Sequence, residues 1–255
     1  FDKVKNNFRA IIVIALFYFY FGAILGSYFQ SLNSRMAKDQ NLNFSNLNTE
    51  SRRSNCDICG NDLQIFELIP IISFLFLKGR CRHCNQKISI EHLTSELLFG
   101  LIVLSLSFNA SLDLNFASSI LFFCLLFAIA LFDLKFFLIP KNYLFVLILT
   151  SCVFALVNEY VVNFIFALFF TLSIWLMKYI LDHVKKEETF GLGDVFIIFA
   201  LGCYFEPILF SLIILTSALS GLVIFTIRFI FSNPEKKLPF GTLMALSAFS
   251  SEVLV

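Results

Sequence analysis

The sequence predicts an all-α polytopic membrane protein with about eight transmembrane helices and a small loop domain between the first two. Of its 255 residues, 58% are hydrophobic and only 15% are charged, whereas a soluble domain carries about 25% charged residues. A soluble core of this size could not bury so much apolar surface, so lipid must surround most of the chain. Eight apolar segments and one long polar segment give the order of the elements.

The apolar segments fall at about residues 10–30, 93–109, 116–132, 143–157, 160–180, 194–204, 207–227 and 239–254. The first follows three basic residues, and its apolar run of about 20 residues is too long for the h-region of a signal peptide. We therefore expect it to span the membrane. Several of the others are shorter than the ~20 residues that cross a full hydrocarbon core. The shortest begins at Asp194, and we expect it to be tilted, broken or merged with its neighbour.

The polar segment from about residue 33 to residue 92 is too long for a turn and too polar to span a membrane. It contains four cysteines and should form a small extramembrane domain. The expected organisation is a first transmembrane helix over 1–32, a loop domain over 33–92 and a transmembrane domain over 93–255.

Basic residues are distributed unequally between the two sides of this arrangement. Sixteen of the 19 Lys and Arg residues fall on the side of the polar segment. They are Arg35, Lys38, Arg52, Arg53, Lys78, Arg80, Arg82, Lys87, Lys135, Lys141, Lys178, Lys185, Lys186, Arg228, Lys236 and Lys237. The opposite connectors contain Asp113, Glu159 and Glu206 but no basic residue. The positive-inside rule therefore places the polar segment in the cytoplasm. The net charge of +1 gives no reason to expect a nucleic-acid partner.

Two C-x-x-C pairs lie in the polar segment, at Cys56 and Cys59 and at Cys81 and Cys84, with 21 residues between the pairs. Two such turns can complete a tetrahedral four-sulfur site for zinc. The alternative is two disulfides, which would need an oxidising compartment. Because the charge distribution places this segment in the cytoplasm, we favour structural zinc.

Two aspartates stand near the ends of apolar segments on the predicted cytoplasmic side. Asp133 ends the third segment, and Asp194 begins the sixth in the sequence Gly-Leu-Gly-Asp. Paired carboxyl groups are the apparatus of aspartyl proteolysis, in which one ionised group activates water and one protonated group donates to the carbonyl oxygen. Gly191 and Gly193 lack a Cβ, so an extended substrate could lie close beside Asp194.

These features resemble the bacterial prepilin peptidases, the type IV leader peptidase group of GxGD aspartyl proteases. The resemblance covers nearly the whole chain in the family's order. Matching stretches are Gly26-Ser27-Tyr28-Phe29 through Arg35, the loop from Cys56 to Cys84, Asp133 with Ile139-Pro140, Gly191 to Asp194, and Leu238-Pro239-Phe240-Gly241. The resemblance implies that Asp133 and Asp194 are catalytic, and that Pro140 joins Gly191 and Gly193 as a substrate-binding residue.

The family's activity is cleavage of the short basic leader of type IV prepilins or pseudopilins, after a Gly, on the cytoplasmic side of the bacterial inner membrane. The resemblance therefore implies a prepilin or pseudopilin as the partner. Members with the zinc loop commonly also methylate the new N-terminus with S-adenosylmethionine. No Gly-rich methyl-donor fold is visible in the sequence, so that activity depends on the resemblance alone.

The sequence departs from the family pattern at four positions. Gln30 stands where Asn is usual, Lys141 where Asp or Asn follows the Ile-Pro pair, and Thr242 where Pro is usual. Phe196 replaces a Lys, so a basic neighbour of the aspartates is missing. We expect this last change to alter substrate preference or rate more than the reaction itself.

Two other classes of protein fit some of these features. A presenilin-like intramembrane protease also uses a GxGD aspartate, but it carries a Pro-Ala-Leu sequence that is missing here and no four-cysteine loop. A cation-coupled transporter with a structural zinc loop could use Asp133 and Asp194 to bind ions. A transporter would often show repeated halves, and the sequence has none.

Overall fold

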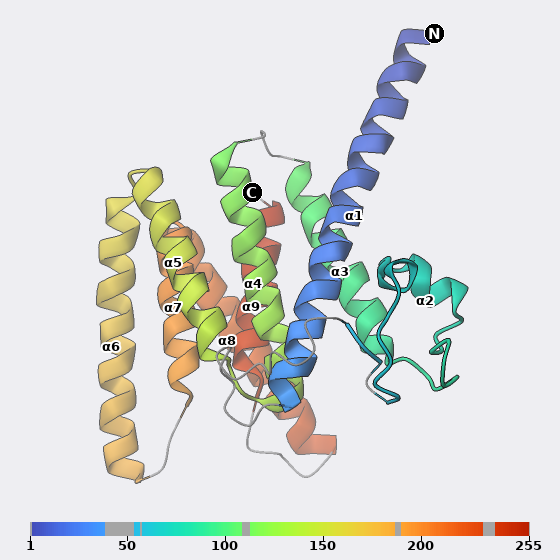
Figure 1. Ribbon diagram of the computed structural model, residues 1–255. Helices are drawn as coiled ribbons and strands as arrows, with labels where there is room; N and C mark the ends of the chain where they lie inside the picture. The colour runs from blue at the N-terminus through green and yellow to red at the C-terminus, as the bar shows by residue number, and fades with distance from the viewer. Residues whose placement is uncertain are drawn as a thin grey trace. The chain divides into compact units, whose positions relative to one another are not determined.

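The computed structural model describes residues 2–38, 54–56, 58–108, 113–186, 190–231 and 238–254. The chain forms two compact units, residues 1–116 and 117–255 (Figure 1). Four basic residues that support the predicted orientation, Arg52, Arg53, Lys236 and Lys237, lie outside the described residues.

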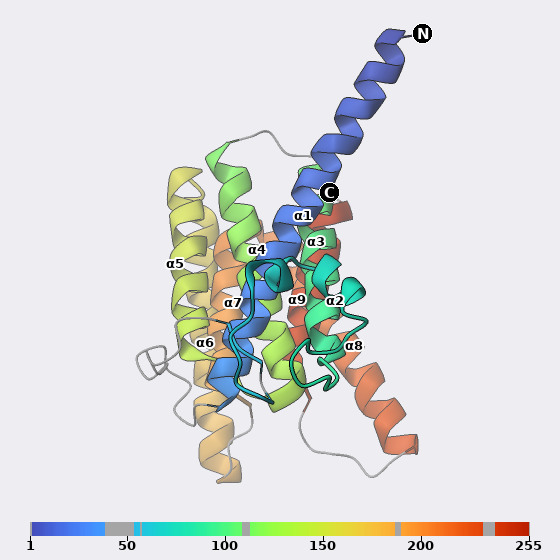
Figure 2. The same ribbon diagram turned by 45° about the vertical axis from the view of Figure 1, so that its right-hand side comes forward.

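The first unit is built on two long helices, α1 (Asp2–Lys38) and α3 (Ile90–Ser107), which lie side by side (Figures 1 and 2). Glycines allow their backbones to approach closely. A Cβ on Gly22 would lie 2.4 Å from the Phe99 carbonyl oxygen, and one on Gly26 would lie 2.7 Å from that of Ser95. This G-x-x-x-G spacing is common where apolar helices pack in lipid. Lipid provides no hydrophobic driving force for helix association, so the helices rely on the close van der Waals packing that small residues allow.

The chain between these helices forms short elements. They are a 3-10 helix, η2 (Ile65–Leu68), a helix of five residues, α2 (Ile72–Phe76), and two single antiparallel bridges, Asn55 with Asp62 and Arg80 with Lys87. Helix α1 continues to Lys38, so the start of the predicted polar loop is helical.

The second unit consists of helices packed in a bundle. They are α4, which begins just before the boundary (Leu114–Phe136), α5 (Lys141–Val157), α6 (Val161–Lys185), α7 (Leu192–Tyr204), α8 (Pro207–Phe231) and α9 (Phe240–Leu254). Helix α4 lies at the core of this bundle, where Phe122, Phe123, Leu126 and Ile129 are fully buried.

Tyr204 anchors the end of the short helix α7. Its ring stacks on Phe122 of α4 at 4.3 Å and on Phe154 of α5 at 4.4 Å between centroids. Its hydroxyl donates a hydrogen bond to Ser119 Oγ at 2.7 Å. Burying a tyrosine hydroxyl is favourable only when it finds such a partner. Because α7 has only 13 residues, fixing this end also restricts where its first residues lie.

All eight predicted apolar segments are helices, but eight transmembrane spans are not confirmed. Five helices, α1, α3, α4, α6 and α8, are long and apolar enough to cross a membrane. The other three, α5, α7 and α9, have 17, 13 and 15 residues. At about 1.5 Å per residue, 13 residues reach only ~20 Å of a hydrocarbon core of about 30 Å. The described part of the chain is thus all-helical with five candidate spans.

Candidate functional site

Asp133 lies in the last turn of α4, in the second unit, with only 5% of its surface exposed. Its partners come from the start of α9. The backbone N–H of Thr242 donates to Asp133 Oδ2 at 3.2 Å, and the hydroxyl Oγ1 lies 3.5 Å from the same oxygen. The hydroxyl also donates to the Ala130 carbonyl at 3.0 Å. The first backbone N–H groups of a helix have no partner within the helix, so they stabilise a nearby carboxylate. At the start of α9 this carboxylate is that of Asp133, which belongs to α4.

Gly241 makes this approach possible. A Cβ at this position would lie 3.1 Å from Asp133 Oδ2 and 3.3 Å from Ile197 Cδ1. Both distances are tighter than side chains normally tolerate, so a larger residue would displace the carboxyl group. The short Pro-Phe-Gly sequence therefore packs against the Asp133 carboxyl group, although it lies more than 100 positions further along the chain.

Asp194 is the third residue of α7, whose N-cap is Gly191. Its side chain is half-buried and accepts a hydrogen bond from the Gly191 backbone. A carboxylate is favourable in the first turn of a helix, where it faces the positive end of the helix dipole. The charges of Asp133 and Asp194 interact, so the fold brings together two acidic residues separated by 61 positions.

The three predicted substrate-binding residues lie in different surroundings. A Cβ on Gly191 would lie at ordinary contact distances, 3.4 Å from Asp194 Oδ2 and 3.9 Å from the Gly193 backbone nitrogen, and Gly191 is exposed. A Cβ on Gly193 would lie 2.9 Å from Cδ1 and 3.0 Å from Cβ of Ile139. Pro140 is buried and caps α5. The space beside Gly191 is open, whereas Gly193 allows the segment that contains Ile139 and Pro140 to pack against the start of α7.

The four cysteines of the loop come together in the first unit. Their Sγ atoms all lie within 4.8 Å of one another, with Cys56 to Cys84 and Cys59 to Cys81 at 4.0 Å. Four sulfurs around a tetrahedral zinc with bonds of ~2.3 Å would be about 3.8 Å apart. The donor set and its spacing therefore fit a metal ion.

Each cysteine pair lies on a tight turn closed by backbone hydrogen bonds. Gly60 N–H donates to the Cys56 carbonyl and Asn85 N–H to the Cys81 carbonyl, each at 2.9 Å. Gly60 and Asn85 both adopt positive φ, at 71° and 56°. Glycine adopts this backbone conformation without steric cost, and asparagine tolerates it better than most other residues.

The turns also influence the ionisation of the thiols. Backbone N–H groups of Cys84 and His83 lower the pKa of the Cys81 thiol to about 6. The Gln86 backbone favours the Cys84 thiolate, but burial and the neighbouring thiols outweigh it and raise the pKa of Cys84 to about 11. Several thiolates so close together repel one another, and a bound cation would remove that repulsion.

The structure shows the surroundings of three of the four residues that depart from the family pattern. Gln30 is buried and its Nε2 donates to Glu91 Oε2 at 3.4 Å. Thr242 donates its backbone N–H to Asp133, and a proline there would have no N–H. Phe196 is exposed. A buried basic residue does lie near the GxGD turn, because Lys178 Nζ is 5.4 Å from the ring of Phe190 and forms an ion pair with Asp182 at 2.6 Å.

Sequence reasoning missed the roles of Gly241, Thr242 and Glu96. The first two belong to a recognised motif, but nothing in the sequence links that motif to Asp133. Glu96 stands near the start of a predicted apolar segment, where a carboxylate is commonly solvated, yet it is only 7% exposed. Its place inside an apolar segment was the available signal, because acidic residues are costly there unless they have a partner or a function.

Comparison with known proteins identifies two family models along the chain. Residues 20–110 match the bacterial peptidase A24 N-terminal domain, and residues 120–226 match the type IV leader peptidase family. No solved structure matches the chain.

Three relatives are all named prepilin leader peptidase/N-methyltransferase. The protein from Bacillus subtilis (strain 168) is 33% identical over 126 residues, which cover 49% of this chain and 48% of that protein. Those from Dichelobacter nodosus and Aeromonas salmonicida (strain A449) are 27% and 28% identical, over 77% and 88% of this chain and 69% and 77% of theirs. The chain thus spans about half the length of the Bacillus relative and more of the other two.

Proposed function

Because the chain belongs to the type IV leader peptidase family, we propose that it is a membrane aspartyl endopeptidase. It cleaves the short basic leader of type IV prepilins or pseudopilins after a Gly, on the cytoplasmic side of the membrane. The observation that carries this proposal is the pairing of Asp133 and Asp194 at the ends of two apolar helices. The names of the relatives support the same activity.

In the proposed mechanism the two carboxyl groups share the acid and base roles. One is ionised and removes a proton from the attacking water, and the other is protonated and donates to the carbonyl oxygen of the scissile bond. The backbone N–H of Thr242 stabilises negative charge on Asp133, which suits Asp133 to be the base. Asp194 would then be the acid, and the open space beside Gly191 would admit the extended substrate.

The four-cysteine cluster is proposed to hold structural zinc. The sulfur spacing and the paired turns support it, and zinc would supply no chemistry beyond fixing the loop. The N-methyltransferase part of the relatives' names supports a second activity, methylation of the new N-terminus with S-adenosylmethionine as donor.

The protein is proposed to lie in the bacterial inner membrane. Its five candidate spans and its bacterial relatives support this location. The excess of basic residues on the side of the polar segment supports a cytoplasmic position for both the cysteine loop and the aspartates. A presenilin-like protease and a cation-coupled transporter are not favoured by the family matches.

The test is cleavage of a purified prepilin by Asp133→Asn and Asp194→Asn variants. Each should lose about 10²- to 10⁴-fold in rate, the usual contribution of a positioned acid or base. Glu206→Gln, which changes an exposed carboxylate at the start of another helix, is the matched control and should cleave normally. Full activity of either aspartate variant would refute the assignment of the pair.

A further inference from the structure

The cysteine loop presents an exposed apolar patch on its two short helices, η2 and α2. The side chains at its two ends, Ile65 and Phe76, are 87% and 84% exposed. The patch comprises six large apolar residues, Ile65, Phe66, Leu68, Ile72, Leu75 and Phe76. A gathering of exposed apolar side chains of this kind marks a surface that binds a protein or a membrane.

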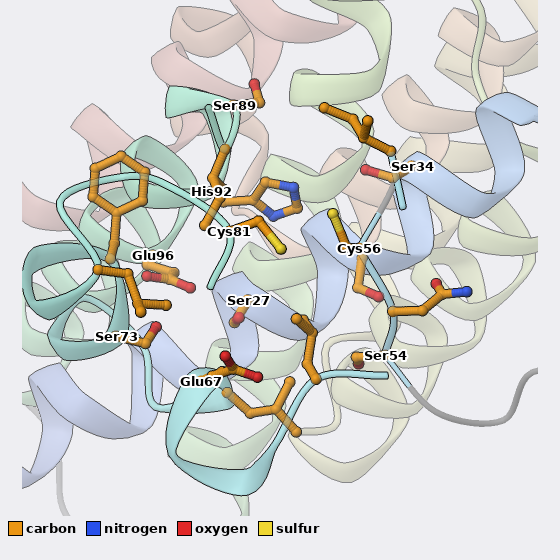
Figure 3. A pocket seen from close by; sticks show the side chains of 18 of the residues that line it. Ser27, Ser34, Ser54, Cys56, Glu67, Ser73, Cys81, Ser89, His92 and Glu96 are labelled. Atoms are coloured by element: carbon orange, nitrogen blue, oxygen red, sulfur yellow. The ribbon is translucent and has the colours of Figure 1, made fainter. Parts of the chain in front are cut away.

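Polar side chains of the same two helices point the opposite way. Glu67 of η2 is only 8% exposed. Together with Ser73 of α2 and Glu96 of α3, it lines the cavity that the loop encloses with α1 and α3. Figure 3 shows these three side chains close together around the cavity. In a soluble domain carboxylates lie outside and large apolar residues inside, whereas ionisable residues of membrane segments face the protein interior. The distribution in η2 and α2 is that of a segment in lipid.

The contact between α2 and α3 gives the depth of this segment. Ile71, the N-cap residue of α2, donates its N–H to Glu96 Oε2 at 2.6 Å. Glu96 lies about 9 Å along α3 from the first residue of that helix, Ile90, at ~1.5 Å per residue. Helix α3 has 18 residues and needs its whole length to cross a hydrocarbon core of about 30 Å. The start of α2 is therefore level with the membrane interior, and in both views α2 lies at a height between the two ends of α3 (Figures 1 and 2).

The backbone of the segment meets the requirement that this depth imposes. Inside a membrane, polar backbone groups must find partners within the protein. The N-cap residues of both short helices donate their N–H groups to carboxylates, Gln64 to Glu67 Oε2 at 2.7 Å and Ile71 to Glu96 Oε2. The residue before Ile71 is Pro70, which has no N–H to satisfy. These contacts also explain why two carboxylates are buried beneath the loop.

Basic residues beside the patch indicate which partner covers it. Lys78, Arg80, Arg82 and Lys87 follow the patch along the loop and are exposed. The guanidinium carbon of Arg82 lies 5.3 Å from the centre of the Phe66 ring. An apolar face flanked by Lys and Arg is typical of elements that lie in the interface of an anionic membrane. A second copy of this chain would bring an identical set of positive charges and be repelled.

We propose that η2 and α2 insert into the leaflet on the side of the cysteine loop. The six residues of the patch lie among the acyl chains, and the basic residues that follow them contact the phosphate groups of anionic lipids. The loop predicted from its polarity to be extramembrane is then partly embedded. This inference depends on the first unit alone and does not rest on the peptidase reaction.

The experiment measures contact between the patch and acyl chains by tryptophan fluorescence. The sequence contains one tryptophan, so Trp175→Phe gives a full-length background without tryptophan emission. Ile65→Trp and Phe76→Trp are made separately in this background, and Asn61→Trp, at an exposed polar position of the same loop, is the matched control. Each protein is reconstituted into vesicles of phosphatidylethanolamine and phosphatidylglycerol, with or without brominated acyl chains, because bromine quenches tryptophan on contact.

Brominated lipid should remove most of the emission of both patch variants, and their emission maxima should lie at shorter wavelength than that of the control. The control should keep its emission. The proposal is overturned if brominated lipid quenches neither patch variant, or if it quenches the control equally. Blue-shifted emission that brominated lipid does not quench would assign the patch to a protein partner instead and would also overturn it. Unchanged zinc content checks that each variant is folded, and prepilin cleavage by the Trp175→Phe protein tests the proposed function separately.

Discussion

Substitution of Gly241 by alanine tests whether the start of α9 controls Asp133. The added Cβ would lie 3.1 Å from Asp133 Oδ2 and 3.3 Å from Ile197 Cδ1. The carboxyl group would have to move by a few tenths of an ångström to relieve this contact. The Thr242 N–H bond to Asp133 is already 3.2 Å long, at the upper end of the normal range, so this movement should break it.

The size of the effect follows from that hydrogen bond. A hydrogen bond to a charged group contributes about 1.5–3 kcal/mol, and each 1.4 kcal/mol corresponds to about a tenfold change in rate. If the bond stabilises the ionised Asp133 that activates water, Gly241→Ala should lower kcat about 10- to 150-fold. Alanine is a better helix former than glycine by about 1 kcal/mol, so the free energy of unfolding of the second unit should not fall in parallel.

The assay is the initial rate of prepilin cleavage by purified protein in detergent, with kcat and KM measured separately. Gly221→Ala is the matched control, because its Cβ would lie 3.3 Å from Leu243 Cδ1, the flexible end of a side chain that can move. The control should cleave like the wild type. A Gly241→Ala protein that is folded and cleaves at the wild-type rate would refute the inferred link between α9 and Asp133.

Further predictions concern packing, metal binding and orientation. Gly193→Ala would bring its Cβ to 2.9 Å from Ile139 Cδ1 and should lower the free energy of unfolding by about 1–3 kcal/mol through overpacking; an unchanged thermal midpoint would contradict this. Cys81→Ser with Cys84→Ser should release the metal and impair prepilin cleavage less than methyl transfer, measured by atomic emission and both activities on one precursor; retention of a full equivalent of zinc would rule out the four-sulfur site. A membrane-impermeant thiol reagent applied to intact cells should miss the cysteine loop and label a cysteine introduced at Glu159, and the reverse pattern would invert the proposed orientation.

The helical segments and the cysteine pairs could be predicted from the sequence because both depend on local information. A long run of apolar residues indicates that the segment lies in lipid. Because lipid offers no hydrogen-bond partners, the backbone groups of such a segment must bond to one another, and a helix achieves this. The spacing within each C-x-x-C pair likewise describes one tight turn. The predicted number of eight spans is not confirmed, because local apolarity does not reveal whether a helix is long enough to cross the membrane, and α5, α7 and α9 are short.

The composition of the candidate sites was decided by tertiary structure. Thr242 reaches Asp133 across 109 positions of sequence, and no periodicity in either segment indicates that the two helix ends meet. Glu96 lies at a helix start that looks solvated in sequence, but its burial depends on the loop that folds over it. Local composition determines where a segment is stable, whereas the partner of a buried carboxyl group depends on which distant segments pack beside it.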